Sequence, residues 1–257
     1  MPAITNHPYL PQPESDILKV WRYMSFTKFL DILSNQRLFL NRADNFEDIW
    51  EGIISQATFN IKSNNLILAS FQTDKQETIK QNNFLRNWTY INCWHLNEYE
   101  SAAMWDLYSD TKEAIAIETT YKDLVNCLPS DTLVASVKYI DYDKTMMPVE
   151  NQLTPFIYKR TSFSHEKEIR IIKQDERRIV TEDDSKFLKR KNSECDDNND
   201  LKGIFINNIN LKQLVKTLYV SPKASVSFFK LVKKVVNEDY KLDIEIKQSD
   251  LYKDPIY

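Results

Sequence analysis

A dense strand signal lies in the stretch His165-Glu166-Lys167-Glu168-Ile169-Arg170-Ile171-Ile172. Its β-branched content is typical of a β-strand, and we predict one over residues 168–172. Successive side chains of a strand point to opposite faces, so Ile169 and Ile171 are expected to face a core. Glu166, Glu168 and Arg170 then share the other face, which we expect to look into a cleft.

Further elements can be placed outward from this stretch by hydrophobic periodicity. Strands are predicted over residues 18–23, 38–40, 90–96, 114–117, 134–139, 204–206, 218–220 and 242–247. Helices are predicted over residues 26–35, 48–54, 75–88, 100–108, 121–127, 145–160 and 224–237, with Ser25 and Asp48 as N-caps of the first two. Strands and helices do not alternate strictly, so we predict an α+β fold with a split or bent mixed β-sheet flanked by helices.

The chain is predicted to form one domain with two unusual segments. Residues 1–16 hold four of the nine prolines and are expected to form an extended N-terminal segment, followed by a single α+β domain over 17–257. Within that domain, seventeen of the thirty residues in 173–202 are charged. Such a segment cannot bury enough apolar surface to offset its ordering entropy, so we predict a solvated hairpin or a disordered insertion there.

The composition excludes several classes of function. The chain has two glycines, Gly52 and Gly203, which is too few for a dinucleotide fingerprint, and they lie too far apart in the sequence to form a P-loop or a nucleophile elbow. Three histidines and three dispersed cysteines leave no zinc or iron motif, so we expect no metal cofactor. The net charge of −3 provides no general attraction to nucleic acid, and no apolar run is long enough to span a membrane. The interpretation is a cytoplasmic protein without a membrane partner.

The polar face of the 168–172 strand is a candidate acid–base site. Two neighbouring carboxylates, Glu166 and Glu168, repel each other, which tends to raise the pKa of one of them. Arg170 on the same face counters that shift. The arrangement suits a site that grips ribose hydroxyls or transfers a proton, and the alternative is a solvated strand face.

Two further groups of side chains are candidates for ligand contact. Trp105 and Tyr108 share a face of the 100–108 helix and could stack on a base or a nicotinamide ring, so we expect Trp105 to be partly exposed. Core packing is the alternative for both. Asp48 and Glu51 belong to an acidic turn in which helix capping explains part of the charge. A divalent cation is the other interpretation of that turn.

A weak nuclease signal lies near the C-terminal end. Asp243-Ile244-Glu245-Ile246-Lys247 contains the Glu-x-Lys pattern of magnesium-dependent, restriction-type nucleases. In such enzymes carboxylates bind Mg²⁺ and the lysine stabilises charge. A nuclease that uses Glu245 and Lys247 is therefore kept as an alternative function.

The order of the motifs resembles a bacterial family of domains of unknown function, family 2971. The resemblance rests on segments distributed over about 18–250. They are Trp21–Ser25, Phe29–Leu33, Leu38–Asp48 with Glu51-Gly52, Asn92–Trp94, Ala103–Asp110, Ala114–Ile117, Tyr158-Lys159, Glu166–Ile172 and Leu218–Pro222.

A second resemblance is to ADP-ribosyltransferase-like folds. These place a polar residue on the first strand and a catalytic glutamate on a late strand, often as Glu-x-Glu. Arg22 and Tyr23 match the first position and Glu166-Lys167-Glu168 the last, whereas Asn92-Cys93-Trp94 stands where such folds carry small hydroxyl residues. Which of Arg22, Tyr23 and Arg42 would touch the cofactor stays open.

This second resemblance implies an enzyme that uses NAD as its substrate. Glu168 would hold the ribose and stabilise the positive charge that develops as nicotinamide leaves, with Glu166 in a smaller role. Arg22 would pair with the diphosphate, and Trp105 or Tyr108 would flank the ring. A toxin or anti-phage defence effector would fit this activity, with NAD or a related nucleotide and an acceptor as partners. The non-enzymatic alternative is a module that binds a nucleotide or a protein.

Overall fold

The computed structural model describes residues 2–64, 75–108, 112–148, 151–174 and 203–255. The predicted insertion at 173–202 lies almost wholly outside the described residues. The strands are β1 Lys19–Ser25, β2 Leu38–Arg42, β3 Thr89–Leu96, β4 Ala114–Thr120, β5 Leu133–Ser136, β6 Lys138–Ile140, β7 Tyr158–Arg160, β8 Glu168–Gln174, β9 Gly203–Ile206, β10 Thr217–Val220 and β11 Glu245–Gln248.

The α-helices are α1 Phe26–Asn35, α2 Gln56–Asn64, α3 Lys75–Trp88, α4 Ala102–Tyr108, α5 Tyr121–Asn126, α6 Thr154–Ile157, α8 Leu211–Leu214 and α9 Val226–Lys233. Two 3₁₀ segments, η1 Ala43–Asn45 and η3 Thr161–Glu166, and a π-helix, η5 Lys234–Asp239, complete the described elements. None of the described helices is both long and apolar enough to cross a membrane.

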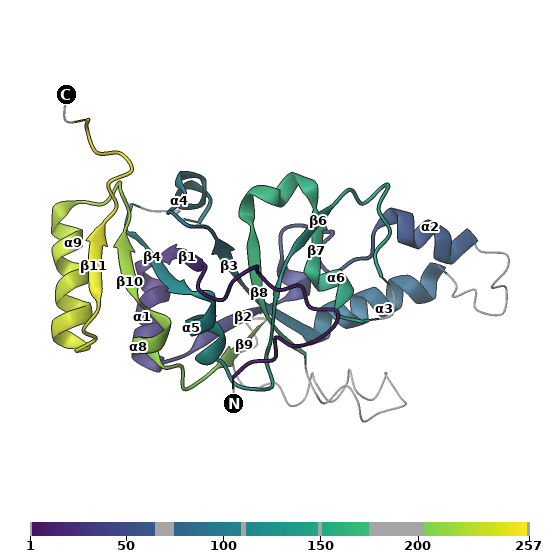
Figure 1. Cartoon of the computed structure of the whole chain (residues 1–257), viewed down its shortest axis with the longest axis horizontal. Coiled ribbons are helices and arrows are strands. Elements are labelled where there is room, and N and C mark those ends of the chain that lie inside the picture. The colour runs from purple at the N-terminus through teal and green to yellow at the C-terminus, as the bar shows by residue number, and fades with distance from the viewer. Residues whose placement is uncertain (1, 65–74, 109–111, 149–150, 175–202, 256–257) are drawn as a thin grey trace.

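A mixed nine-stranded sheet is the centre of the molecule, and helices flank it (Figure 1). The path through the sheet runs β11-β10-β4-β1-β3-β2-β9, with β8 on β3 and β5 on β8. The β10–β11 pair is parallel and the other pairs of this sheet are antiparallel. The predicted α+β class with a mixed sheet is therefore confirmed.

The sheet is split along β3. Ile91 pairs with Ile172 of β8 and with Asn41 of β2, whereas His95 pairs with Glu168 of β8 and with Trp21 of β1. A strand has two edges, so β8 occupies one edge of β3 while β1 and β2 share the other. Beyond residue 21, β1 no longer pairs with β3 and diverges from it.

Three apolar clusters cover the two faces of the sheet. The largest packs α1, α5, α8 and α9 against one face, with Phe29, Leu124 and Val232 fully buried. The opposite face carries two smaller clusters. One joins α4 to β1 and β4, and the other joins α6 to the centre of β3 and β8. In Figure 1, α4 and α6, the helices of these two clusters, lie on either side of β3.

Local sequence explains the elements that were predicted correctly. Ser25 caps α1 by accepting a hydrogen bond from the backbone of Lys28, as expected. The proline-rich N-terminal segment contributes more than an extended lead-in, because Ala3 and Leu10 are buried. Ile4 also forms a parallel bridge with Leu133.

Three element predictions were wrong. The helix expected over 48–54 is a pair of turns, because Gly52 adopts a left-handed backbone that stops helical propagation. The helix expected over 145–160 shrinks to α6, with Pro155 in its first turn and an extended residue at its end. The strand expected over 134–139 is two strands, β5 in the main sheet and β6 paired with β7 in a separate two-stranded sheet.

Replacing Gly52 by alanine is expected to destabilise the protein by about 1–3 kcal/mol. Its φ of 71° is unfavourable for other residues, and an added Cβ would lie 2.5 Å from a ring carbon of the fully buried Phe156. The measurement is the urea midpoint of unfolding, with Asn207→Ala at an exposed position as the control. An unchanged midpoint for Gly52→Ala would show that the turn relaxes freely.

Candidate functional site

A buried ionic network lies on the face of the sheet that carries the two smaller apolar clusters. The β3–β8 register sets Cys93 beside Arg170 and His95 beside Glu168, so all four lie on the face that carries these clusters. Glu51, Lys159 and Glu166 reach the same place from other parts of the chain. We call Glu51, Lys159, Glu166, Glu168 and Arg170 the ionic network; each is at most 8% exposed.

Arg170 is the central cation of the network. Its Nη1 and Nη2 atoms donate to the two carboxylate oxygens of Glu51 at 2.5 and 2.9 Å. Its Nε atom donates to Glu168 at 2.7 Å, and Nη1 also reaches the carbonyl of Phe156. A guanidinium whose charge is matched by two carboxylates can remain ionised inside a protein. The charges of Glu168 and Glu51 outweigh burial and raise the pKa of Arg170 well above its usual value.

Lys159 joins the two glutamates that the sequence singled out. Its ammonium group lies 2.5 Å from an oxygen of Glu166 and 2.7 Å from an oxygen of Glu168. One carboxylate oxygen of Glu168 therefore accepts a hydrogen bond from Lys159, and the other accepts one from Arg170. Glu166 has Lys159 as its cationic partner.

The network contains three carboxyl groups and two cations, so it is neutral when one carboxyl carries a proton. Burial by itself would raise the pKa of Glu168, but the charge of Arg170, together with Glu166 and Lys159, holds it well below its usual value. Burial, the hydrogen bond to Glu168 and the charge of Glu168 raise the pKa of Glu166 to about 7, against the influence of Lys159. Glu166 is thus the member that gains or loses a proton near neutral pH.

The sequence correctly predicted that Glu168 and Arg170 lie together on one face of β8, but the prediction that this face is open to solvent was wrong. Glu168 and Arg170 lie on one face of β8 and contact each other. That face does not look into an open cleft, because Glu168 is 5% exposed and Arg170 is fully buried. Glu166 also does not continue the strand alternation, since it ends η3 and is followed by Lys167 in a left-handed conformation.

Arg22 lies at the split between β1 and β3. Its Nη1 atom donates to the carbonyl of Cys93 at 3.0 Å, and its guanidinium lies 5.9 Å from the ring centroid of Trp94. Within the described residues no carboxylate pairs with Arg22. Burial lowers its pKa to about 10. Its side chain is half-buried, so a cation there without a counter-ion is unfavourable, and an anionic ligand would offset part of that cost.

Tyr108 lies within electrostatic range of both Arg22 and the ionic network. It ends α4 and is 45% exposed, yet its hydroxyl lies within electrostatic range of Glu166, Cys93 and Glu168. Burial of the hydroxyl end is the main cause of the raised pKa of Tyr108. Arg22 lies within the same range of Tyr108. Four of the predicted site residues, Arg22, Tyr108, Glu166 and Glu168, are therefore brought together.

Trp105 and Tyr23 belong to the core instead. Trp105 is 2% exposed, so the expectation that it is partly exposed was wrong. It packs edge-on against the Tyr23 ring at 5.0 Å and donates to Glu100. Tyr23 accepts a hydrogen bond from the backbone of Ser101 and so fixes the start of α4. Both residues position the helix that carries Tyr108.

Asp48 and Glu51 have separate partners. Glu51 is 2% exposed and pairs with Arg170, which makes it a member of the ionic network. Asp48 accepts from the backbone of Trp50 and from Arg160 at 2.8 Å, so it stabilises a turn next to the network. No helix begins at Asp48, contrary to the predicted cap.

The two residues of the predicted nuclease motif, Glu245 and Lys247, lie away from this site. Glu245 and Lys247 are on β11, at an edge of the sheet, where they pair with each other at 2.9 Å and are about half exposed. Across the described part of the chain, no group of three or more histidine, cysteine, aspartate or glutamate residues is arranged to hold a metal ion.

Sequence reasoning missed the side chains that complete the site. Lys159 is part of the resemblance to family 2971, but the sequence assigned it no role in a site. Buried His95 lies with its Nδ1 atom 2.6 Å from the carbonyl of Glu166, and the Tyr139 hydroxyl accepts from the backbone of Glu168. The Cys93 thiol has a pKa well above its usual value, mainly because of burial and secondly because of the charge of Glu168. Only cross-strand register could have pointed to His95 and Cys93.

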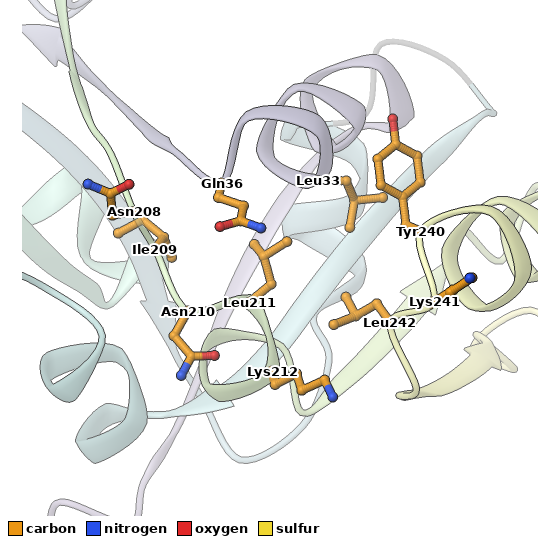
Figure 2. A pocket seen from close by; sticks show the side chains of 10 residues that line it. All are labelled: Leu33, Gln36, Asn208, Ile209, Asn210, Leu211, Lys212, Tyr240, Lys241 and Leu242. Atoms are coloured by element: carbon orange, nitrogen blue, oxygen red, sulfur yellow. The ribbon is translucent and has the colours of Figure 1, made fainter.

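A surface pocket of about 430 Å³ lies elsewhere, between the end of α1, the turn before α8 and the segment after η5 (Figure 2). The Gln36 amide extends into it above Leu211, and Leu33 and Leu242 form one side. Its lining residues are Leu33, Gln36, Asn208, Ile209, Asn210, Leu211, Lys212, Tyr240, Lys241 and Leu242. None of the predicted site residues lines this pocket.

Comparison with known proteins gives no match, because no family model, no curated protein and no solved structure is significantly similar to the chain. The two resemblances stated from the sequence therefore stay predictions.

Proposed function

We propose that the protein is an ADP-ribosyltransferase-like enzyme that breaks the bond between ribose and nicotinamide in NAD. The observation that carries the proposal is the gathering of three groups: a half-buried Arg22 that pairs with no carboxylate of the described residues, a partly exposed Tyr108, and a Glu166 with a pKa of about 7. Clusters of ionisable groups with shifted pKa values are typical of active sites.

The roles that we propose differ from the sequence expectation in one respect. Glu168 already has both oxygens engaged by Lys159 and Arg170, so it acts as a positioning residue. Glu166, which gains and loses a proton near neutral pH, is the proton-accepting group. Arg22 supplies positive charge for the diphosphate, and Tyr108, which is 45% exposed, offers an aromatic ring for the nicotinamide.

The proposed reaction balances without a metal or a redox partner. The carbon–nitrogen bond to nicotinamide breaks, and the ring nitrogen keeps the electron pair, so the charged pyridinium leaves as neutral nicotinamide. An acceptor, water in the simplest case, bonds to the ribose carbon. The acceptor proton passes to the carboxylate of Glu166.

The experiment is a chromatographic measurement of nicotinamide released from NAD by the purified protein, with calorimetric measurement of NAD binding. We expect both binding and release, and we expect Arg22→Gln to weaken binding. Lys19→Gln, on the same strand but in a surface pair with Glu118, is the matched control. Absence of both binding and release would contradict the proposal.

A second candidate is a non-catalytic nucleotide-binding module. The specific observation that favours it is the complete pairing of Glu168, which leaves no free oxygen on that carboxylate. NAD binding that depends on Arg22 but gives no nicotinamide would support this alternative over the enzyme.

A further inference from the structure

Lys159 occupies the closing point of a short loop in the chain. It lies on β7, and the chain then passes through η3 and returns as β8. Its ammonium group contacts Glu166 at the end of η3 and Glu168 at the start of β8. One side chain therefore ties both ends of the loop together.

The loop also covers the lysine that closes it. The Phe163 ring, within η3, lies 4.6 Å from the Lys159 ammonium group, and Lys159 is 8% exposed. An aromatic face stabilises a cation and keeps water away from it. The two ion pairs of Lys159 consequently lie in a shielded environment, where a charge interaction is stronger than at the surface.

The other cation of the network cannot replace Lys159. Arg170 already donates to Glu51, Glu168 and the carbonyl of Phe156. Other titratable groups lie near Glu166. Tyr108 of α4 and Tyr139 of β6 lie within electrostatic range of its carboxyl group, and His95 of β3 contacts the backbone carbonyl of Glu166. His165 and Lys167 flank it and are exposed. Of the described groups around Glu166, Lys159 is the cation that contacts the Glu166 carboxylate directly.

We infer that Lys159 is the positioning residue that holds Glu166 against Glu168 and so sets the pH at which Glu166 exchanges its proton. The assignment of Glu166 to the reaction rests on the proposed function, whereas the clamp itself is a property of the folded chain. Without the ammonium group, Glu166 would face the charge of Glu168 alone and would hold its proton more tightly. The loop over 161–166 would also lose the contact that fixes its end.

The test is a carbon-13 NMR titration of the glutamate side-chain carboxyls in the full chain, for wild type and Lys159→Met. Loss of an opposite charge at this distance is expected to raise the Glu166 midpoint by about 1–3 pH units. Lys159→Arg, which keeps the charge, is expected to stay closer to wild type. Lys173→Met is the matched control, because Lys173 pairs with Asp131 at the surface and should leave the midpoint unchanged.

A second measurement uses the unaltered protein in case Lys159→Met does not fold. A nitrogen-15 spectrum of the lysine ammonium groups should contain a slowly exchanging Lys159 signal that shifts as Glu166 titrates near pH 7. The inference would be overturned if the titration midpoint of Glu166 were the same in wild type and Lys159→Met. It would also be overturned if the Lys159 signal did not shift with pH. Neither result depends on NAD, so failure of the clamp is distinguishable from failure of the proposed enzyme.

Discussion

Replacing Arg170 by alanine is expected to cost about 3–5 kcal/mol of folding free energy, because it leaves two buried carboxylates without their shared cation. A domain of ordinary stability has about 5–15 kcal/mol in total, so a large part of the protein should unfold under mild denaturing conditions. The effect follows from position as well as charge, since Arg170 is fully buried between Glu51 and Glu168.

The measurement is urea unfolding followed by circular dichroism at pH 7, with Arg37→Ala as the control. Arg37 also makes a two-pronged pair, with Asp31, but both partners are about one-third exposed. Exposed pairs contribute about 1 kcal/mol or less. If Arg170→Ala cost no more than Arg37→Ala, the ionic network would not be a determinant of the fold.

Replacing Glu166 by glutamine is expected to lower the rate of nicotinamide release about 10²–10⁴-fold, the usual contribution of a positioned acid–base group. Glutamine has nearly the same shape but cannot accept the acceptor's proton. Glu118→Gln is the control, because Glu118 pairs with Lys19 outside the network. Near-wild-type release by Glu166→Gln would remove Glu166 from the proposed mechanism.

The same variant should keep its fold, and the reason lies in the direction of the pKa shift. The folded protein raises the pKa of Glu166, so the stabilisation from its bound proton is present below the unfolded pKa and is lost as the pH rises through about 7. At pH 8 the wild type carries an extra buried negative charge that Glu166→Gln lacks. We expect the variant to unfold at a urea concentration equal to or higher than wild type at that pH.

Strong local signals allowed much of the fold to be predicted from the sequence. Isoleucine-rich β8, the Ser25 cap of α1 and the amphipathic pattern of residues 26–35 each depend on neighbours within a few positions. The failures also have local causes. At Gly52 the left-handed backbone stopped the helical pattern, and Pro155 fixed the start of a one-turn helix inside the predicted longer one.

The site could be predicted only in part because its contacts are made far apart in the chain. The sequence placed Glu168 and Arg170 together, since they are two positions apart on one strand. It could not show that Glu51 would pair with Arg170 across 119 positions. It also could not show that Lys159 would turn inward, because that depends on a second small sheet that the hydrophobic pattern did not predict.

The most direct test of the proposed mechanism is the pH dependence of nicotinamide release at saturating NAD. Because the carboxylate form of Glu166 accepts the proton, the wild-type rate should rise with pH and level off above about 7. Glu166→Gln should show a much lower rate without this rise. A wild-type rate that is flat between pH 5 and pH 9, or a rise that persists in Glu166→Gln, would contradict the role of Glu166 as the proton acceptor.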